Sequence, residues 1–392
     1  MRSIYNKNIA AVIIITAAMN IACQNSNKEK DEINIMLSTD TLTNVEDLFS
    51  EIDLCYLDSN DNSNISGVAL STKMFDDIIL VESSNGIIYV YNYLGKFLGS
   101  SKNVRGNGHG EFNVFTGFSY NRYSQQLEIL TPKEMLFYDS NFRYMSKIEI
   151  PTEDPQKDVR GTFYRQIFDF SKTQHILLTS PIENRPNEFV LFNSNSIKEG
   201  ERFSYDKYAI TESSMQEQSF FELNDQEYLF FPPCLTNKIF TCNKNGKVEP
   251  YATYTGSELI SSKDVEIYSK NRNKMLEFLA YKCNKIMPLR GLGNSKRICT
   301  FFKKGGSTLD TYTTIFNINN RTSKTVRNRT KTDVYLPIFS KMSGDTLFAL
   351  VPPQDIKKMG KLSILNRKSK SLIESASDET NYAIAKYILS KN

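Results

Sequence analysis

Residues 77–98 read DIILVESSNGIIYVYNYLGKFL, and this stretch decides the fold. It holds an apolar run at Asp77–Val81, a polar turn, a second apolar run at Ile87–Tyr91, a turn at Leu94–Lys96 and a third run from Phe97. Short apolar runs joined by turns rich in Gly, Asn and Ser predict a meander of antiparallel strands. Because the runs are continuously apolar rather than alternating, we expect a sheet that is covered on both faces.

The same order of strands and turns returns five more times along the chain. The six copies begin near residues 77, 127, 175, 227, 297 and 346, so successive starts lie 50, 48, 52, 70 and 49 residues apart. About fifty residues per copy is the length of a four-stranded propeller blade. The repeat therefore predicts an all-β, six-bladed β-propeller that occupies residues 33–392.

The two ends of the predicted propeller need a way to close the ring. We expect residues 33–58 and Tyr382–Leu389 to meet in one shared blade, which leaves no free sheet edge. A short helix is the alternative for Tyr382–Leu389, because its alanines permit one. In the sixth copy, the pattern places the second strand at Lys361–Leu365 and the third from Ser371 onward.

The one long step, between the fourth and fifth copies, indicates an insertion at about residues 255–292. Apolar side chains recur there at three- and four-residue spacing, which is the period of a helix. The pattern predicts a single helix from roughly 264 to 283, with Ser262 and Asp264 as candidates to cap its start.

Composition and charge exclude some classes of function. The 392 residues are 40% hydrophobic, and 48 basic against 44 acidic residues give a net charge of +4. Such a small excess gives no reason to expect a nucleic-acid partner, which normally needs a concentrated basic face. The two histidines, His109 and His175, belong to no Cys/His motif, and no CxxC occurs. We therefore predict no metal site and no cofactor.

Five cysteines remain when Cys23 is set aside, so at least one thiol stays unpaired or pairs between chains. Cys234 and Cys242 lie in strand-like surroundings and could meet across a hairpin. The favoured interpretation is that both are small buried hydrophobic residues.

The N-terminus has the features of an export signal. Arg2 and Lys7 precede the uncharged run Ile9–Met19, which is too short to span a bilayer comfortably. Cys23 follows Ala22 in a segment that resembles a bacterial lipobox, although Asn20 replaces the usual aliphatic residue. The resemblance implies a signal peptide at 1–22, a lipid on Cys23 and a flexible tether over 23–32. Cleavage without a lipid, or an uncleaved anchor, are the alternatives.

Two neighbouring segments carry a family resemblance. Val90–Leu98 and Gly106–Phe112 resemble the first blade of the six-bladed β-propeller lipoproteins of Bacteroidetes, which are relatives of NHL-repeat propellers. In that family an F-D-x-x-G-K-F turn precedes a G-x-G-P-G-E-[YF] loop, whereas this chain has Asn92 for Asp and His109 for Pro. The resemblance implies the propeller fold and a location in the cell envelope, at the outer membrane.

The Gly106–Phe112 loop is the strongest local motif for binding. Its alternate glycines could adopt positive φ and expose amide groups, as an anion-binding nest does. Arg105, His109 and Glu111 are then the candidate binding residues. The competing interpretation, which we favour, is a tight connection between blades in which Glu111 holds the loop by hydrogen bonds.

No catalytic motif is evident, and the sequence contains no GxSxG turn. We therefore favour a lipid-anchored binding or scaffold module for a glycan, a peptide or an envelope protein. The alternative is a propeller enzyme, a lyase or hydrolase, with its site at the mouth of the central channel. The fold alone does not distinguish a binding module from an enzyme. Histidine, tyrosine, arginine and carboxylate side chains gathered at the channel mouth would favour the enzyme.

Overall fold

The computed structural model describes residues 33–36, 42–43, 45–150, 164–179, 187–195, 201–206, 216–269, 271–307, 310–330, 332–376 and 380–390. The predicted signal peptide, the predicted lipidation site Cys23 and the predicted tether lie outside these residues.

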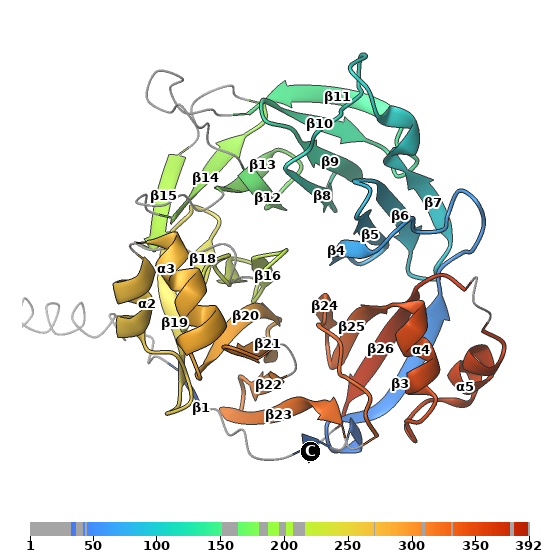
Figure 1. Cartoon of the computed structure of the whole chain (residues 1–392). Helices are drawn as coiled ribbons and strands as arrows, with labels where there is room; N and C mark the ends of the chain where they lie inside the picture. The colour runs from blue at the N-terminus through green and yellow to red at the C-terminus, as the bar shows by residue number, and fades with distance from the viewer. Residues whose placement is uncertain are drawn as a thin grey trace, which may run out of the picture.

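Six sheets surround a central axis within the described residues, and each sheet forms one blade (Figure 1). Blades 1 to 3 are built from β4 (Ala69–Met74), β5 (Ile78–Ser83), β6 (Ile88–Asn92) and β7 (Phe97–Ser100); β8 (Gly117–Asn121), β9 (Gln126–Leu130), β10 (Glu134–Tyr138) and β11 (Tyr144–Glu149); and β12 (Tyr164–Asp169), β13 (Gln174–Thr179), β14 (Asn187–Asn193) and β15 (Glu201–Asp206).

Blades 4 to 6 follow the same order. They contain β16 (Phe220–Glu222), β17 (Glu227–Phe230), β18 (Lys238–Asn243) and β19 (Val248–Thr255); β20 (Ile286–Gly293), β21 (Arg297–Lys304), β22 (Thr311–Asn317) and β23 (Thr322–Thr330); and β24 (Lys341–Ser343), β25 (Thr346–Val351), β26 (Ala383–Leu389) and β3 (Phe49–Tyr56). The predicted six-bladed propeller is confirmed.

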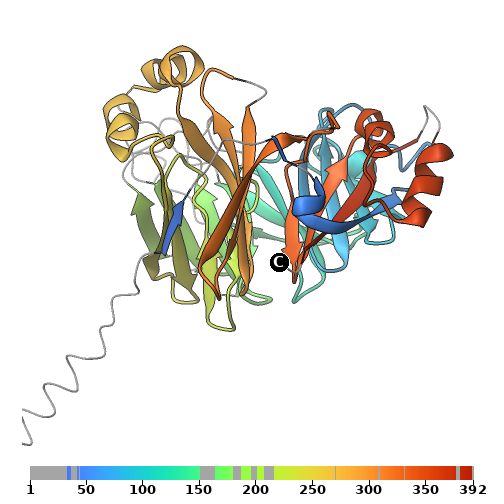
Figure 2. The same ribbon diagram turned by 90° about the horizontal axis from the view of Figure 1, so that it is seen from below.

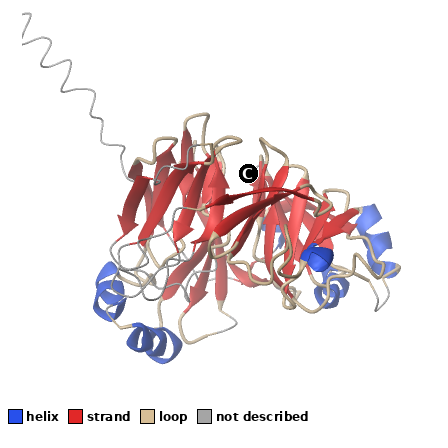
Figure 3. Ribbon diagram, turned by 90° about the horizontal axis from the view of Figure 1, so that it is seen from above, coloured by secondary structure: helices blue, strands red, loops and turns tan. Residues whose placement is uncertain are grey.

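The first strand of each blade lies nearest the axis, so β4, β8, β12, β16, β20 and β24 surround the centre of Figure 1. Neighbouring strands within these blades are antiparallel, and the turns from first to second strands therefore all lie on one face of the ring, which we call the lower face. The opposite, upper face carries the helical segments, which lie toward the same end of the blades in Figures 2 and 3.

Blade 6 closes the ring as predicted, because the N-terminal β3 pairs antiparallel with the C-terminal β26 and places Leu54 opposite Ala385. The remainder of the predicted N-terminal segment does not join this blade. Strand β1 (Ile33–Met36) instead pairs in parallel with β19 of blade 4, and β2 (Leu42–Thr43) pairs in parallel with β23 of blade 5. A short 3-10 helix, η1 (Val45–Asp47), leads from β2 to β3.

The prediction of strands at Lys361–Leu365 and from Ser371 onward is wrong. After β25, which is the first strand of the sixth copy, the chain forms α4 (Pro353–Met359) and α5 (Arg367–Glu374). The next strand of the blade is β26. Pro353 occupies the first turn of α4, where its missing N–H has no helical partner to lose. Strand β26 also overturns the helical alternative for the C-terminal stretch.

The predicted insertion between blades 4 and 5 is confirmed, but it is not one helix. It forms α2 (Ser262–Ser269), α3 (Arg272–Glu277) and the π-helix η4 (Phe278–Lys282). The Asn271 side chain accepts a hydrogen bond from the Lys274 N–H and so begins a new helix. The cap of α2 comes from Ser261, whose Oγ accepts from the Asp264 N–H at 3.0 Å, rather than from Ser262.

The hydrophobic core lies between the blades. Leu80 and Val90 of blade 1, for example, pack with Phe118 and Ile129 of blade 2, and each of the other neighbouring pairs shares a comparable cluster. A further cluster around Met275 lies beneath the helical insertion. Burial on both faces explains why the strands read as continuous apolar runs.

The cysteines pack as apolar residues. Cys234, Cys242, Cys283 and Cys299 are buried, and Cys55 is partly buried. The favoured interpretation of Cys234 and Cys242 as buried hydrophobic residues is thus confirmed. Among the described residues, none of the helices has the length and apolar character needed to cross a membrane.

Candidate functional site

A cavity of about 440 Å3 opens at the lower mouth of the central channel, and the first strand of every blade contributes to its wall. Its volume falls within the range of roughly 300–1,000 Å3 that small-molecule sites have. A larger cavity, of about 520 Å3, lies near the junction of blades 1 and 6, but none of the residues that line it is an acid, a base or a histidine. The channel mouth is therefore the better candidate for a site with chemistry.

Charges of both signs line this lower cavity in equal number. Its cationic side chains are Lys73, Arg122 and Lys341, and its carboxylates are Asp76, Asp169 and Glu222. Two ion pairs join side chains from different blades: Arg122 Nη2 lies 3.0 Å from Glu222 Oε2, and Lys341 Nζ lies 2.7 Å from Asp76 Oδ1. The cavity is polar without favouring a ligand of either charge.

Aromatic rings form the rest of the lower cavity wall. Phe168 of blade 3 stacks on Phe220 of blade 4, with ring centroids 5.0 Å apart, and packs edge-on against Tyr228. Phe75 meets Tyr120 edge-on at 5.7 Å in the neighbouring part of the wall. The Tyr120 hydroxyl donates to Asp77 Oδ2 at 3.1 Å, which fixes the ring.

Lys73 lines both the lower cavity and a second cavity of about 270 Å3, which lies on the upper side of the channel. Its Nζ donates to the Phe118 carbonyl oxygen at 2.6 Å. Burial lowers the pKa of Lys73 to about 8, although the carboxylates of Glu217 and Glu82 oppose that shift. Glu217 also pairs with the buried Arg290 at 3.1 Å, so the channel wall carries a network of buried charges.

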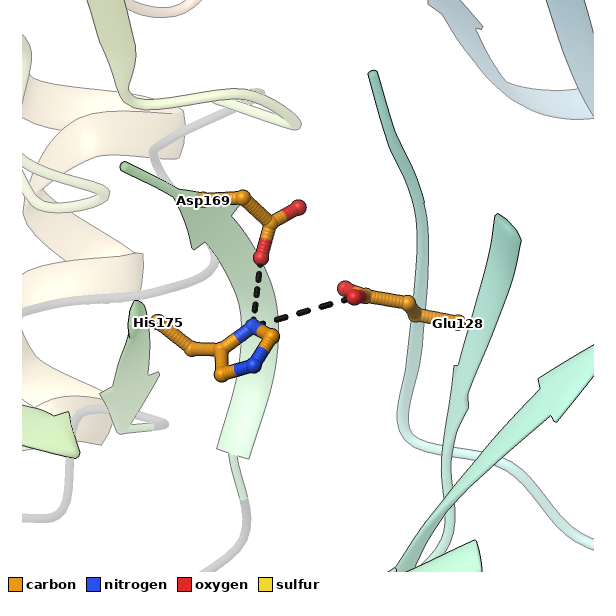
Figure 4. Close-up of side chains that lie close together, drawn as sticks. All are labelled: Glu128, Asp169 and His175. Carbon is orange, nitrogen blue, oxygen red and sulfur yellow. Dashed lines mark hydrogen bonds and ion pairs between the residues drawn. The ribbon is translucent and has the colours of Figure 1, made fainter. Parts of the chain in front are cut away.

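A buried group of three side chains lies beside the channel, between blades 2 and 3 (Figure 4). Asp169 ends β12 and His175 lies opposite it on β13, while Glu128 reaches toward them from β9. His175 Nδ1 is 2.6 Å from Asp169 Oδ1 and 3.7 Å from Glu128 Oε1. Because Asp169 also lines the lower cavity, this buried cluster is separated from the channel by one side chain.

Two neighbours fix the geometry of the buried cluster. Asn121 Nδ2 donates to Glu128 Oε1 at 3.1 Å and to the Ser171 carbonyl oxygen at 3.1 Å. The Phe192 ring stacks on the His175 imidazole, with centroids 5.0 Å apart. The three side chains are thus held by both blades rather than by one loop.

Burial dominates the electrostatics of the cluster. It raises the pKa of Glu128 well above the ordinary value, and the neighbouring Asp169 adds to this rise. Burial also raises the pKa of Asp169 to about 8 and lowers the pKa of His175. Two carboxyl groups and one imidazole in such a place can share a proton or bind a cation.

The predicted binding residues Arg105, His109 and Glu111 lie elsewhere, in an exposed connection between blades 1 and 2. Arg105 follows the short 3-10 helix η2 (Ser101–Val104) and donates to the Gly86 carbonyl oxygen at 2.9 Å. His109 packs edge-on against Tyr144, with ring centroids 4.8 Å apart. None of the three predicted residues lines either channel cavity. Their role in binding stays a prediction.

Glu111 accepts a hydrogen bond from the Gly108 N–H at 2.9 Å, as the competing interpretation expects. Of the three loop glycines, Gly110 alone has a positive φ, of +70°. At Gly106 and Gly108 the Glu111 carboxylate occupies the space that a Cβ would need, so a side chain there would displace this carboxylate.

Sequence reasoning missed the residues of the channel mouth and of the buried cluster. One signal was available: Glu128 and His175 are polar residues within otherwise apolar strands of the second and third copies. Asn121 and Asp169 likewise end the first strands of these two blades. Which of these side chains face one another depends on how neighbouring blades pack, and that is not visible in a single sequence.

Comparisons with solved structures agree with the fold. A Bacteroides fragilis protein described as exported (BF0058) matches with a TM-score of 0.64 and 15% identity, over 92% of this chain and 99% of its own. At that identity the likeness shows the fold alone. A Bacteroides caccae protein of unknown function has a TM-score of 0.33 and 8% identity, over 71% and 80% of the two chains. The WD40 domain of Neurospora crassa Pan2 has a TM-score of 0.36 and 7% identity, over 71% of each chain.

No curated protein sequence matches the chain. The sequence profile of the family described as "Domain of unknown function (DUF4934)" matches residues 30–387, which is nearly the whole propeller. The chain therefore belongs to the DUF4934 family.

Proposed function

We propose that this protein is a lipid-anchored binding module of the cell envelope, and that its ligand is a neutral oligosaccharide held at the lower mouth of the channel. The observation that carries the proposal is the 440 Å3 cavity, to which all six blades contribute. Sites at the axis of a closed ring are preformed, because the packing between blades fixes their walls.

The balance of charges supports a neutral, hydroxyl-rich ligand. Arg122 is paired with Glu222 and Lys341 with Asp76, so a charged ligand would find no unpaired opposite charge at these four side chains. Sugar hydroxyls both donate and accept hydrogen bonds, and they can therefore bridge a pair such as Arg122 and Glu222 without breaking its neutrality. The partly exposed rings of Phe168 and Phe75 offer apolar surface for the C–H side of a pyranose.

An enzyme acting on the same class of ligand is the second candidate. The observation that favours it is the gathering of Tyr120, Arg122 and Glu222 around one cavity. Binding remains the first proposal, because Arg122 and Glu222 already neutralise one another, as do Lys341 and Asp76. Chromatography of the bound oligosaccharide after prolonged incubation separates the two, since only an enzyme returns a shortened or unsaturated product.

The test is a calorimetric titration of the purified protein with a panel of neutral oligosaccharides, preceded by a thermal-shift screen to choose the best one. We expect Glu222→Gln to weaken binding about tenfold or more, because it removes a charged acceptor at the cavity. Glu134→Gln is the matched control, since Glu134 is also ion-paired, to Lys147 at 2.6 Å, but lies outside the cavity. Equal affinities of the two variants, or no binding of any oligosaccharide by the wild type, would contradict the proposal.

A further inference from the structure

The buried cluster of Glu128, Asp169 and His175 lacks hydrogen-bond partners that groups of this kind normally have. Glu128 and His175 are fully buried, and Asp169 is 8% exposed. Glu128 Oε2 has no hydrogen-bond partner, although the carboxylate points at Asp169 and His175 (Figure 4). Buried polar atoms are almost always paired, so this carboxyl oxygen, which faces other ligand-type atoms, requires either a proton shared with Asp169 or a bound cation.

The spacing of the three groups suits a metal ion. One ligand atom from each side chain lies within 4.8 Å of the other two. Ligands bound to tetrahedral zinc at about 2.0–2.2 Å are roughly 3.3–3.6 Å apart, so side-chain rotations that move these atoms by about 1 Å close the cluster around an ion. The same rotations open the 2.6 Å contact between His175 Nδ1 and Asp169 Oδ1 to a ligand-to-ligand distance.

We propose that Glu128, Asp169 and His175 form a site for one divalent transition-metal ion between blades 2 and 3. Imidazole nitrogen and carboxylate oxygen are both zinc ligands, three protein ligands leave the fourth position open, and zinc binds such donors more tightly than manganese or iron does. A bound cation would stabilise the charged forms of both carboxyl groups, which burial alone disfavours.

The cluster also has the supports that a metal site requires. Asn121 holds the Glu128 carboxylate at 3.1 Å, and the Phe192 ring keeps the imidazole plane in place. Because Asp169 lines the lower cavity, an ion and its remaining ligand have a path from the channel. This inference does not depend on the oligosaccharide proposal, because Asp169 is the one residue that the cluster shares with the lower cavity and zinc binding is measured in a separate titration.

The experiment uses the purified protein, stripped with EDTA, dialysed, and incubated overnight with ZnCl2. Bound zinc is counted by elemental analysis after gel filtration, and the affinity is measured by calorimetry. We expect one zinc per chain and a rise of the melting temperature with zinc concentration. Glu128→Gln is expected to weaken zinc binding at least about 100-fold while the metal-free protein stays folded, since glutamine keeps the shape and removes the buried charge.

Asp76→Asn is the matched control, because Asp76 lines the same cavity but pairs with Lys341 and is not a member of the cluster. We expect its zinc affinity to equal that of the wild type. If Glu128→Gln does not fold, Asp169→Asn replaces it. Less than one zinc per chain, or unchanged affinity in the cluster variant, would overturn the proposal and leave the cluster as a group that shares protons.

Discussion

Lys73 is a charged residue of the channel wall whose burial reduces the stability of the folded protein. The side chain is fully enclosed by the blades, and its ammonium donates a hydrogen bond to the Phe118 carbonyl oxygen and lies 4.7 Å from the centre of the Phe118 ring. These contacts do not replace the hydration of the charge, and burial therefore lowers the pKa of Lys73 from 10.5 to about 8. The charged form of Lys73 therefore lowers the free energy of unfolding.

The lowered pKa predicts how stability depends on pH. The unfolded chain binds the Lys73 proton more tightly than the folded chain, so the penalty is complete below pH 8 and is relieved as the pH rises toward 10.5. Between pH 7 and pH 9.5 the relief amounts to about 2 kcal/mol. In Lys73→Met this contribution is absent, so the stability of the variant relative to the wild type is expected to fall over that range.

Urea unfolding of both proteins at pH 7 and pH 9.5 measures this difference. The comparison with the variant cancels the titration of the many other lysines and tyrosines, which both proteins share. Lys147→Met serves as a control, because Lys147 is a largely exposed lysine in an ion pair with Glu134. Parallel pH profiles for the wild type and Lys73→Met would show that burial does not perturb Lys73.

At the scale of the element, strand β3 has the largest effect on the integrity of the ring. It comes from the N-terminal part of the chain and forms the last strand of blade 6, where Ser369 Oγ also accepts a hydrogen bond from the Leu54 N–H at 2.8 Å. Leu54 is 1% exposed and belongs to the cluster between blades 5 and 6. Loss of packing at β3 therefore opens the ring at its closing strand.

We expect Leu54→Ala to lower the free energy of unfolding by about 2–5 kcal/mol, the range for truncating a buried leucine. Leu94→Ala is the matched control, because Leu94 is 80% exposed in a turn of blade 1, and its effect should stay within about 0.5 kcal/mol. Chemical denaturation followed by circular dichroism compares the two. A similar small loss in both variants would mean that blade 6 is not closed by β3.

The sequence predicts the second, third and fourth strands of blades 1 to 5, where each copy repeats its turns, but it does not locate the first strands β4, β8, β12, β16 and β20. The strand prediction is wrong in blade 6, where α4 and α5 separate β25 from β26. The mostly apolar segment Leu362–Leu365, which lies between these helices, has the composition of a strand. The helical insertion was located by its spacing, but the break at Asn271 depends on a capping hydrogen bond that the periodicity does not reveal. The lower cavity was placed only in general terms, because its residues come from six first strands that lie far apart in sequence.

At the scale of the whole molecule, the propeller presents two different faces. The lower face carries the aromatic and charged cavity, whereas the upper face carries α2, α3, α4 and α5. A lipid anchor on Cys23 would hold this ring at a membrane surface. The anchor stays a prediction, since Cys23 lies outside the described residues.

A substitution of Cys23 tests the anchor in cells that process bacterial lipoproteins. We expect the wild type to enter the detergent phase of a Triton X-114 partition and Cys23→Ala to remain in the aqueous phase, because a single thiol carries the lipid. Cys55→Ala is the control, since Cys55 is a free thiol within strand β3 and should leave the partition unchanged. Detergent partition of Cys23→Ala like that of the wild type would contradict lipidation at this residue.

The most direct test of the central claim is a crystal structure of the protein with the neutral oligosaccharide selected by titration. We expect electron density for the sugar in the lower cavity, with a ring against Phe168 and hydroxyl groups within hydrogen-bond distance of Arg122 and Glu222. Density at the Gly106–Phe112 loop with an empty channel mouth, or no bound sugar at saturating concentration, would contradict it.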